Sequence, residues 1–232
     1  MVTIPQLDFK MDFISDLNTR FILHSNTEDA VQMKAYLKHK FNFFGIKAGP
    51  RRQLMRNTMK DHSSELLEEH LNIVYALYKR PEREFHYVAM ELFERYFKKK
   101  YKAADIEHIE FLIVTNSWWD TVDYIAKWIL GRYLQVHPEQ IKKIIPEFSD
   151  STNMWLNRSA ILFQLGYKQN TDAKLLLDLC QEHRNSSDFF IQKAIGWALR
   201  EYAKTAPKVV LDFVKHCDLA PLSKREAIRH LI

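Results

Sequence analysis

Apolar side chains recur along most of the chain with the spacing of one face of an α-helix. In residues 85–96 apolar side chains stand three, four, seven, eight and eleven residues after Phe85. This spacing fits a period of about 3.6 residues per turn. Residues 156–167 and 191–202 repeat this pattern. We find no alternating segment that would make a convincing strand pair. The pattern predicts an all-α protein with about a dozen helices joined by short turns.

Helix punctuation falls between these segments. Prolines tolerate the first turn of a helix, because the N–H that they lack has no partner there. Three prolines stand where such a turn is expected: Pro81, Pro138 and Pro207. Hydroxyl side chains that can cap helix N-termini stand at Ser63 or Ser64, Ser151 and Thr171. We expect helices to begin at these positions.

Four of the predicted helices end near a tyrosine. The tyrosines are Tyr96, Tyr133, Tyr167 and Tyr202, at steps of 37, 34 and 35 residues. A period in the mid-thirties with two helices per unit is typical of an α-solenoid. We therefore expect one curved domain over residues 1–232, with side chains of successive repeats converging on a concave surface.

Polar residues keep the same register. Asp123, Asn157 and Gln192 each stand ten residues before a repeat tyrosine, and Arg158 and Lys193 stand nine before theirs. Matching positions on stacked helices lie side by side in a solenoid. The register predicts a polar and cationic binding groove on the concave face.

The composition narrows the function classes. The chain is 47% hydrophobic and 27% charged, with a net charge of +5 and 5 glycines. There is no HExxH metal motif and no glycine-rich phosphate loop, so we expect neither a metal nor a cofactor. The two cysteines form no CxxC pair, which favours a reducing compartment. The N-terminus resembles no export signal and no apolar run is long enough for a bilayer. We expect a soluble, cytoplasmic protein.

The segment SWWDTVD, residues 117–123, concentrates aromatic and acidic residues. On a helix Trp119 and Asp123 lie on one face, one turn apart. An indole beside a carboxylate can hold a cationic group from two sides. The alternative is that the tryptophans pack in the core and the acids, Asp120 and Asp123, favour a helix start.

Two further pairs place an indole three residues before an arginine: Trp155–Arg158 and Trp197–Arg200. Each can be a structural cation–π contact or a clamp for phosphate, which arginine binds with two hydrogen bonds. A basic segment at residues 47–53 opens a predicted helix. Its free N–H groups and arginines favour a phosphate.

Four separated motifs, LIVTNSWWDTVD, NMWLNRSAILFQL, FFIQKAIGWALREYAKT and LAPLSKREAI, resemble the AlkD-type DNA glycosylases that remove alkylated bases. MKAYLKHKFNFFGIKAGPRRQL and PEREFHYVA extend the similarity from about residue 28 to the end, leaving residues 1–27 as an N-terminal helix and turn outside it. The resemblance implies HEAT-like repeats that wrap duplex DNA in a basic concave groove. It also implies a monomer that excises 3-methyladenine and 7-methylguanine without flipping the base.

The resemblance assigns site residues one by one. The family's catalytic aspartate falls on Asp123, its tryptophan beside the lesion on Trp119, and the arginine that works with them on Arg158. A second aromatic wall falls on Trp197. Trp118 and Asp120 are then left with packing and helix-start roles.

Contacts to DNA are expected at further positions. The family's backbone-contacting residues match Tyr36, Arg52 and Arg56, and we add Arg200 and Lys193 as cations near the expected wall. Two departures from the family pattern occur. Lys47 and Ala48 replace a more polar pair, and the chain stops at Ile232, before a tail seen in relatives.

The chemistry implied is hydrolysis without a general acid, because a cationic base leaves as a neutral molecule. Asp123 would stabilise the positive sugar and orient water, and Arg158 would hold a flanking phosphate and lower the pKa of Asp123. No lysine nucleophile is apparent, so we expect a monofunctional enzyme that leaves an abasic site. The alternatives are a non-catalytic binder of damaged or branched DNA and a protein-binding solenoid scaffold.

Overall fold

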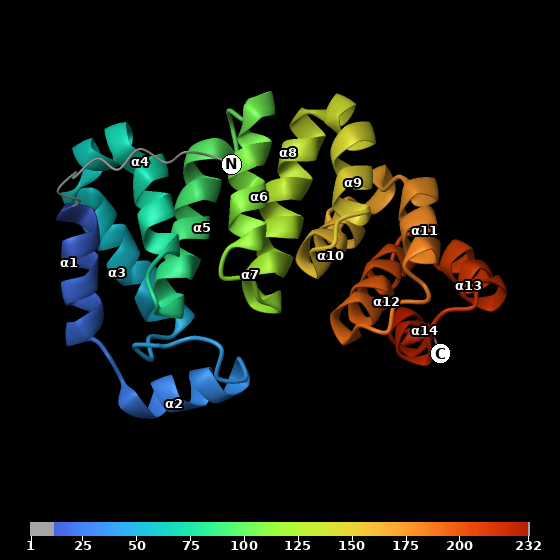
Figure 1. The fold of residues 1–232 in the computed structure, drawn as a ribbon, viewed down its shortest axis with the longest axis horizontal. Helices are drawn as coiled ribbons and strands as arrows, with labels where there is room; N and C mark the ends of the chain where they lie inside the picture. Colours follow the sequence, from blue (N-terminus) through green and yellow to red (C-terminus); the bar gives the residue numbers. More distant parts are fainter. Residues whose placement is uncertain (1–11, 232) are drawn as a thin grey trace. The chain divides into compact units, whose positions relative to one another are not determined.

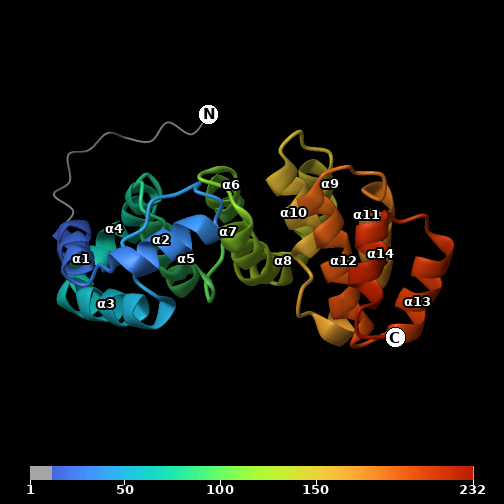
Figure 2. The ribbon, with the colours of Figure 1, turned by 90° about the horizontal axis from the view of Figure 1, so that it is seen from below.

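The computed structural model describes residues 12–231 and is helical throughout, which confirms the all-α class. In this range the one β-type pairing is an isolated bridge between Asn42 and Glu82. The chain divides into two compact units, residues 1–96 and 97–232. Figure 1 and Figure 2 show the helices of each unit. The curvature, the concave groove and the treatment of residues 1–232 as one domain stay predictions.

The first unit is built around packed aromatic rings. Phe21, Phe44 and Phe85 meet pairwise with ring centroids 5.3–5.5 Å apart, a geometry that adds to the gain from burial. The first helix falls in the expected N-terminal segment, of which residues 1–11 lie outside the described part. The helices of this unit are α1 (Asp12–Leu23), α2 (Thr27–Tyr36), α3 (Ala48–Asp61), α4 (Ser63–Tyr78) and α5 (Arg83–Phe97).

In the second unit, contacts join helices that are two apart in the chain. Helix α10 (Met154–Leu162) packs against α7 (Trp119–Tyr124), the π-helix η2 (Ile125–Leu130) and α12 (Phe189–Ala203), and α12 packs against α14 (Pro221–Ile228). The elements are η1 (Ala103–Asp105), α6 (Ile106–Val114), α7 (Trp119–Tyr124), η2 (Ile125–Leu130), α8 (Gly131–Val136), η3 (Pro138–Gln140), α9 (Ile141–Ser149), α10 (Met154–Leu162), η4 (Lys168–Asn170), α11 (Ala173–Glu182), α12 (Phe189–Ala203), α13 (Pro207–His216) and α14 (Pro221–Ile228).

The repeat tyrosines tie neighbouring helices together. The Tyr133 hydroxyl donates to the Ala103 carbonyl at 2.8 Å, and the Tyr167 hydroxyl donates to the Gly131 carbonyl. Burial raises the pKa of Tyr167, so its phenol stays protonated and keeps donating. Two of the four repeat tyrosines therefore share a hydrogen bond to the backbone of an earlier element. Tyr167 itself lies beyond the end of α10, where a helix was expected to continue.

Several helix starts differ by a residue or two from the predictions. Asn153, rather than Ser151, caps α10 by accepting from the Trp155 N–H at 2.9 Å. Asp172, next to Thr171, caps α11 in the same way. Ser63 is the first residue of α4 and not its cap. The three expected prolines behave differently, since Pro207 opens α13 and Pro138 opens η3, while α5 begins two residues after Pro81.

Candidate active site

A tight turn after α6 sets the direction of α7. Asn116 takes a left-handed conformation (φ 47°), which asparagine tolerates better than most residues. The Ser117 hydroxyl then donates to the Ile113 carbonyl at 2.6 Å. Trp118 is extended, and its carbonyl accepts from the Val122 N–H at 3.0 Å. Helix α7 therefore begins at Trp119, and Asp123 follows one turn later.

Asp123 and Arg158 form a buried ion pair between α7 and α10. Arg158 Nε lies 2.7 Å from Asp123 Oδ1, and Nη2 lies 2.9 Å from Oδ2. The side chains are 14% and 5% exposed. Two parallel hydrogen bonds fix both planar groups and are among the stronger contacts in proteins. The structure thus brings together two of the three predicted catalytic residues, which are 35 positions apart.

The rest of the Arg158 guanidinium is held by α12. Its Nη1 donates to the Phe190 carbonyl. Asp188 caps α12 by accepting from the N–H groups of Phe190 and Ile191 at 2.7 and 3.1 Å, so that carbonyl is firmly placed. Each of the three guanidinium nitrogens of Arg158 therefore has a protein partner. These contacts orient Asp123, and the expectation that Arg158 also holds a flanking phosphate stays a prediction.

An aromatic cluster surrounds this pair. Trp118, Trp155 and Phe190 meet pairwise with centroids 5.1–5.7 Å apart, and the Arg158 guanidinium carbon lies 6.0 Å from the Phe190 ring centre. Trp118 has the packing role expected for it. Phe190 was missed, because its contribution is a carbonyl and a ring on a third helix, and no spacing rule in the sequence connects it to Asp123.

Burial controls the acidity of Asp123. Removal from water disfavours the charged carboxylate and is the largest influence, raising the pKa of Asp123 above its ordinary value. The hydrogen bonds and charge of Arg158 lower that pKa, and the charge of Asp120 raises it. The expectation that Arg158 lowers the pKa of Asp123 is confirmed for the effect of the arginine, and burial outweighs that effect.

The predicted aromatic walls are both half-buried. Trp119 is the first residue of α7. Trp197 lies on α12 and packs against the hydrophobic core of the second unit, which contains Ala194 and Leu199. Their roles beside a damaged nucleotide stay predictions.

The two cations predicted on α12 share one carboxylate. Lys193 Nζ lies 3.0 Å from Glu226 Oε1, and Arg200 Nη1 lies 2.6 Å from Glu226 Oε2. These partners lower the pKa of Glu226. Glu226 reaches them because α14 passes close to Gly196, where an added Cβ would lie 2.4 Å from the Glu226 Cβ. Much of the charge expected to face DNA here is thus compensated within the protein.

The expected contacts in the first unit differ in exposure. Tyr36, at the end of α2, is 68% exposed. Arg52 is 51% exposed, and its Nε lies 3.0 Å from Glu91 Oε1, which also binds the buried Arg51. Arg56 is exposed and donates to Gln53 at 2.5 Å. The basic helix start therefore offers fewer uncommitted cations than its sequence indicates, and DNA contact at these positions stays a prediction.

The amides of the polar register tie the backbone together. Asn157 Nδ2 donates to the carbonyls of Phe148, Ser149 and Ser151 at 2.7–3.0 Å. Gln192 Nε2 donates to the Ser186 carbonyl at 2.9 Å. These amides hold the segments that precede α10 and α12, where a binding role had been predicted.

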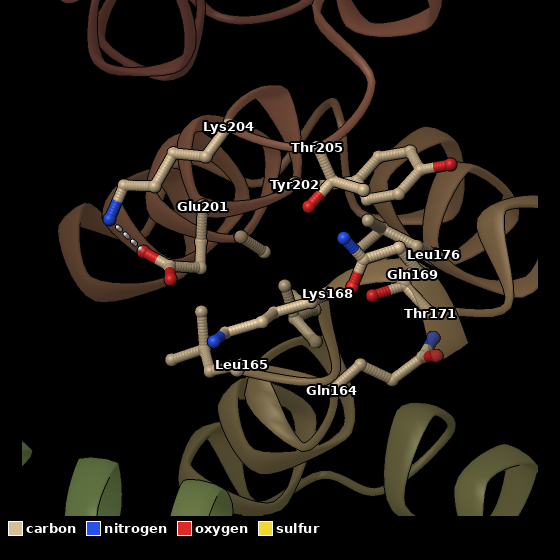
Figure 3. Close-up of a pocket in the computed structure, with 13 residues that line it drawn as sticks. Gln164, Leu165, Lys168, Gln169, Thr171, Leu176, Glu201, Tyr202, Lys204 and Thr205 are labelled. Atoms are coloured by element: carbon tan, nitrogen blue, oxygen red, sulfur yellow. Dashed lines mark hydrogen bonds and ion pairs between the residues drawn. The ribbon is translucent and has the colours of Figure 1, made fainter.

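A separate cavity of about 240 Å³ lies at the C-terminal ends of α10 and α12 (Figure 3). Lys168, Tyr202 and the Lys204–Glu201 ion pair (2.6 Å) are among its lining residues. The set does not include Asp123. This cavity is therefore distinct from the ion pair and its aromatic cluster.

No helix within residues 12–231 is long and apolar enough to cross a membrane. In the same range no three histidine, cysteine or acidic side chains form a group that could hold a metal ion.

The fold and site define an all-helical repeat protein with a carboxylate–guanidinium pair buried beside an aromatic cluster. The family model for DNA alkylation repair enzymes matches residues 17–231. A solved structure described as a predicted DNA alkylation repair enzyme from Enterococcus faecalis is similar, with 34% identity and a TM-score of 0.81. The match covers 89% of this chain and 96% of that one. No curated protein matches. The chain belongs to the DNA alkylation repair enzyme family.

Proposed function

We propose that the protein is a monofunctional DNA glycosylase that releases cationic alkylated purines, such as 3-methyladenine and 7-methylguanine, from duplex DNA. The observation that carries the proposal is the buried Asp123–Arg158 pair. A carboxylate oriented by two hydrogen bonds at low exposure is suited to stabilise positive charge, because preorganised groups in a dry site are worth more than in water.

The reaction needs no general acid. The N-glycosidic bond breaks with its electron pair going to the cationic base, which leaves neutral. Positive charge develops on the deoxyribose, where the Asp123 carboxylate stabilises it. Water adds to the anomeric carbon and gives up one proton, which Asp123 accepts and passes to solvent. The products are a free base and an abasic site.

Arg158 is a positioning residue in this scheme. Its guanidinium binds Asp123 and the Phe190 carbonyl, so it holds the carboxylate in one orientation and opposes the effect of burial on its pKa. Trp119, the first residue of the same helix, would pack on the sugar and exclude water. The damaged base stays in the duplex, and the protein acts on it as a monomer.

The test is release of 7-methylguanine from methylated duplex DNA by the wild type, Asp123→Asn and Asp120→Asn. Asp120 is the matched control, because it carries the same group one turn away in the sequence and is half-buried. We expect loss of most activity in Asp123→Asn and little loss in Asp120→Asn. Equal release by all three would refute the role of Asp123. Thermal melting of each variant shows that it is folded.

The alternative of a non-catalytic DNA binder predicts salt-sensitive binding without base release by the wild type. A protein-binding scaffold predicts no DNA affinity even at low salt. Measuring binding and release on the same duplex separates the three functions.

A further inference from the structure

An exposed indole lies in the π-helix that follows α7, the helix that carries Asp123. Trp128 is 38% exposed and belongs to the π-helix η2 (Ile125–Leu130), which joins α7 to α8. Lys127 Nζ lies 4.5 Å from its ring centre and the Arg132 guanidinium carbon lies 5.0 Å from it. We call these three residues the Trp128 patch. π-Helical turns are rare and are found frequently at functional sites.

The lysine of the patch rests on a glycine of the next repeat. A Cβ at Gly166 would lie 3.3 Å from Lys127 Cε, and Gly166 has a φ of +90°, which only glycine adopts readily. Within residues 12–231 no acidic side chain lies within ion-pair distance of Lys127. Lys193 differs, because its charge is compensated by Glu226. Lys127 is therefore a cation held in a defined position, and its charge is available to a ligand.

The patch is close to Asp123 along the helix. Lys127 follows Asp123 by four residues, about one helical turn, so it lies on the same side of the helix at roughly 6 Å along the axis. One strand of duplex DNA carries a phosphate about every 3.4 Å along the axis. A duplex whose glycosidic bond lies at Asp123 therefore has phosphates of the same strand within reach of the patch.

We propose that the Trp128 patch binds the phosphodiester backbone beside the damaged nucleotide. The inference rests on the proposed function, in that DNA is the ligand. Lys127 binds phosphate, while the indole packs on deoxyribose and holds the lysine in place before binding. Such preorganisation lowers the entropy lost when long side chains are fixed on a ligand.

The experiment measures binding of an unmodified duplex across a salt series. The variants are Trp128→Ala, Trp128→Phe and Lys127→Gln, with Lys143→Gln as the control because Lys143 is an exposed lysine on a different helix, α9. We expect Trp128→Ala to weaken binding roughly two- to tenfold and Trp128→Phe to retain most affinity. Lys127→Gln should reduce the slope of log K against log salt by about 0.9, the value for one lost phosphate contact, and Lys143→Gln should leave it unchanged.

Binding and base release separate this inference from the proposed function. If the wild type releases no base but Trp128→Ala and Lys127→Gln bind DNA more weakly, the proposed function fails and the patch stands. If the wild type releases base and both variants bind as the wild type does, the patch is refuted. For an active enzyme we expect KM to rise and the single-turnover rate at saturating protein to change little. Should Trp128→Ala not fold, the salt slope of Lys127→Gln decides.

Discussion

Replacing Arg158 by glutamine leaves the buried Asp123 carboxylate without its cation, and this change tests the role of the ion pair. The change removes two charge-assisted hydrogen bonds to Asp123, at 2.7 and 2.9 Å. It also removes the positive charge of the guanidinium that donates them. Removing one partner of a buried ion pair costs about 3–5 kcal/mol of stability. We therefore expect a loss of this size at neutral pH.

The same change should move the pH dependence of base release. Arg158 lowers the pKa of Asp123, while burial raises it, so its loss leaves the effect of burial unopposed. Each unit of pKa is about 1.4 kcal/mol, and hydrogen bonds to charged groups contribute about 1.5–3 kcal/mol each. We expect the acidic limb of the profile of rate against pH to move to higher pH by at least about one pH unit.

The free energy of unfolding that Arg158→Gln loses should also depend on pH. When the pKa of a carboxyl is higher in the folded protein than in the unfolded chain, the folded protein binds the proton more tightly. The stability deficit of Arg158→Gln is therefore full above the folded pKa of Asp123 and shrinks as pH falls through it. Urea unfolding at several pH values measures this trend, and the double variant Asp123→Asn/Arg158→Gln is the control. An acidic limb that stays in place or moves downward would refute the reasoning.

Two further predictions concern the contact between α12 and α14. Glu226→Gln should free the two cations that it binds at 2.6–3.0 Å, tightening DNA binding and steepening the salt slope by up to about 0.9 per cation. Glu147→Gln on α9 is its control, because Glu147 is exposed, and equal slopes would contradict the prediction. Gly196→Ala should cost about 1–3 kcal/mol, because its Cβ would lie 2.4 Å from a side-chain atom of α14. At Gly49 in α3 an added Cβ meets nothing within 4 Å, so Gly49→Ala should melt no lower than the wild type.

The helical class and the repeat were predictable because both leave a periodic record in the sequence. The hydrophobic period identified α5 and α12. The tyrosine period found two equivalent contacts, since Tyr133 and Tyr167 each bond to an earlier backbone carbonyl. Exact helix starts were less predictable, because several polar residues near each start compete to cap it, as Ser151 and Asn153 do before α10.

The site was predictable only in part. A family resemblance brought Asp123 and Arg158 together, although 35 residues separate them. Contacts made by the backbone have no sequence signature, so the Phe190 carbonyl was missed. The pairing of Lys193 with Glu226 depends on how closely α14 approaches α12. The pKa of Asp123 depends on its burial, which a helix pattern does not quantify.

The most direct test of the account is the rate of 7-methylguanine release from methylated duplex DNA by Asp123→Asn, compared with the wild type under single-turnover conditions. The account predicts that the wild type releases the base and that the variant, folded and still bound to DNA, loses most of that rate. Release by the variant at the wild-type rate would contradict the central claim that Asp123 supplies the catalytic charge.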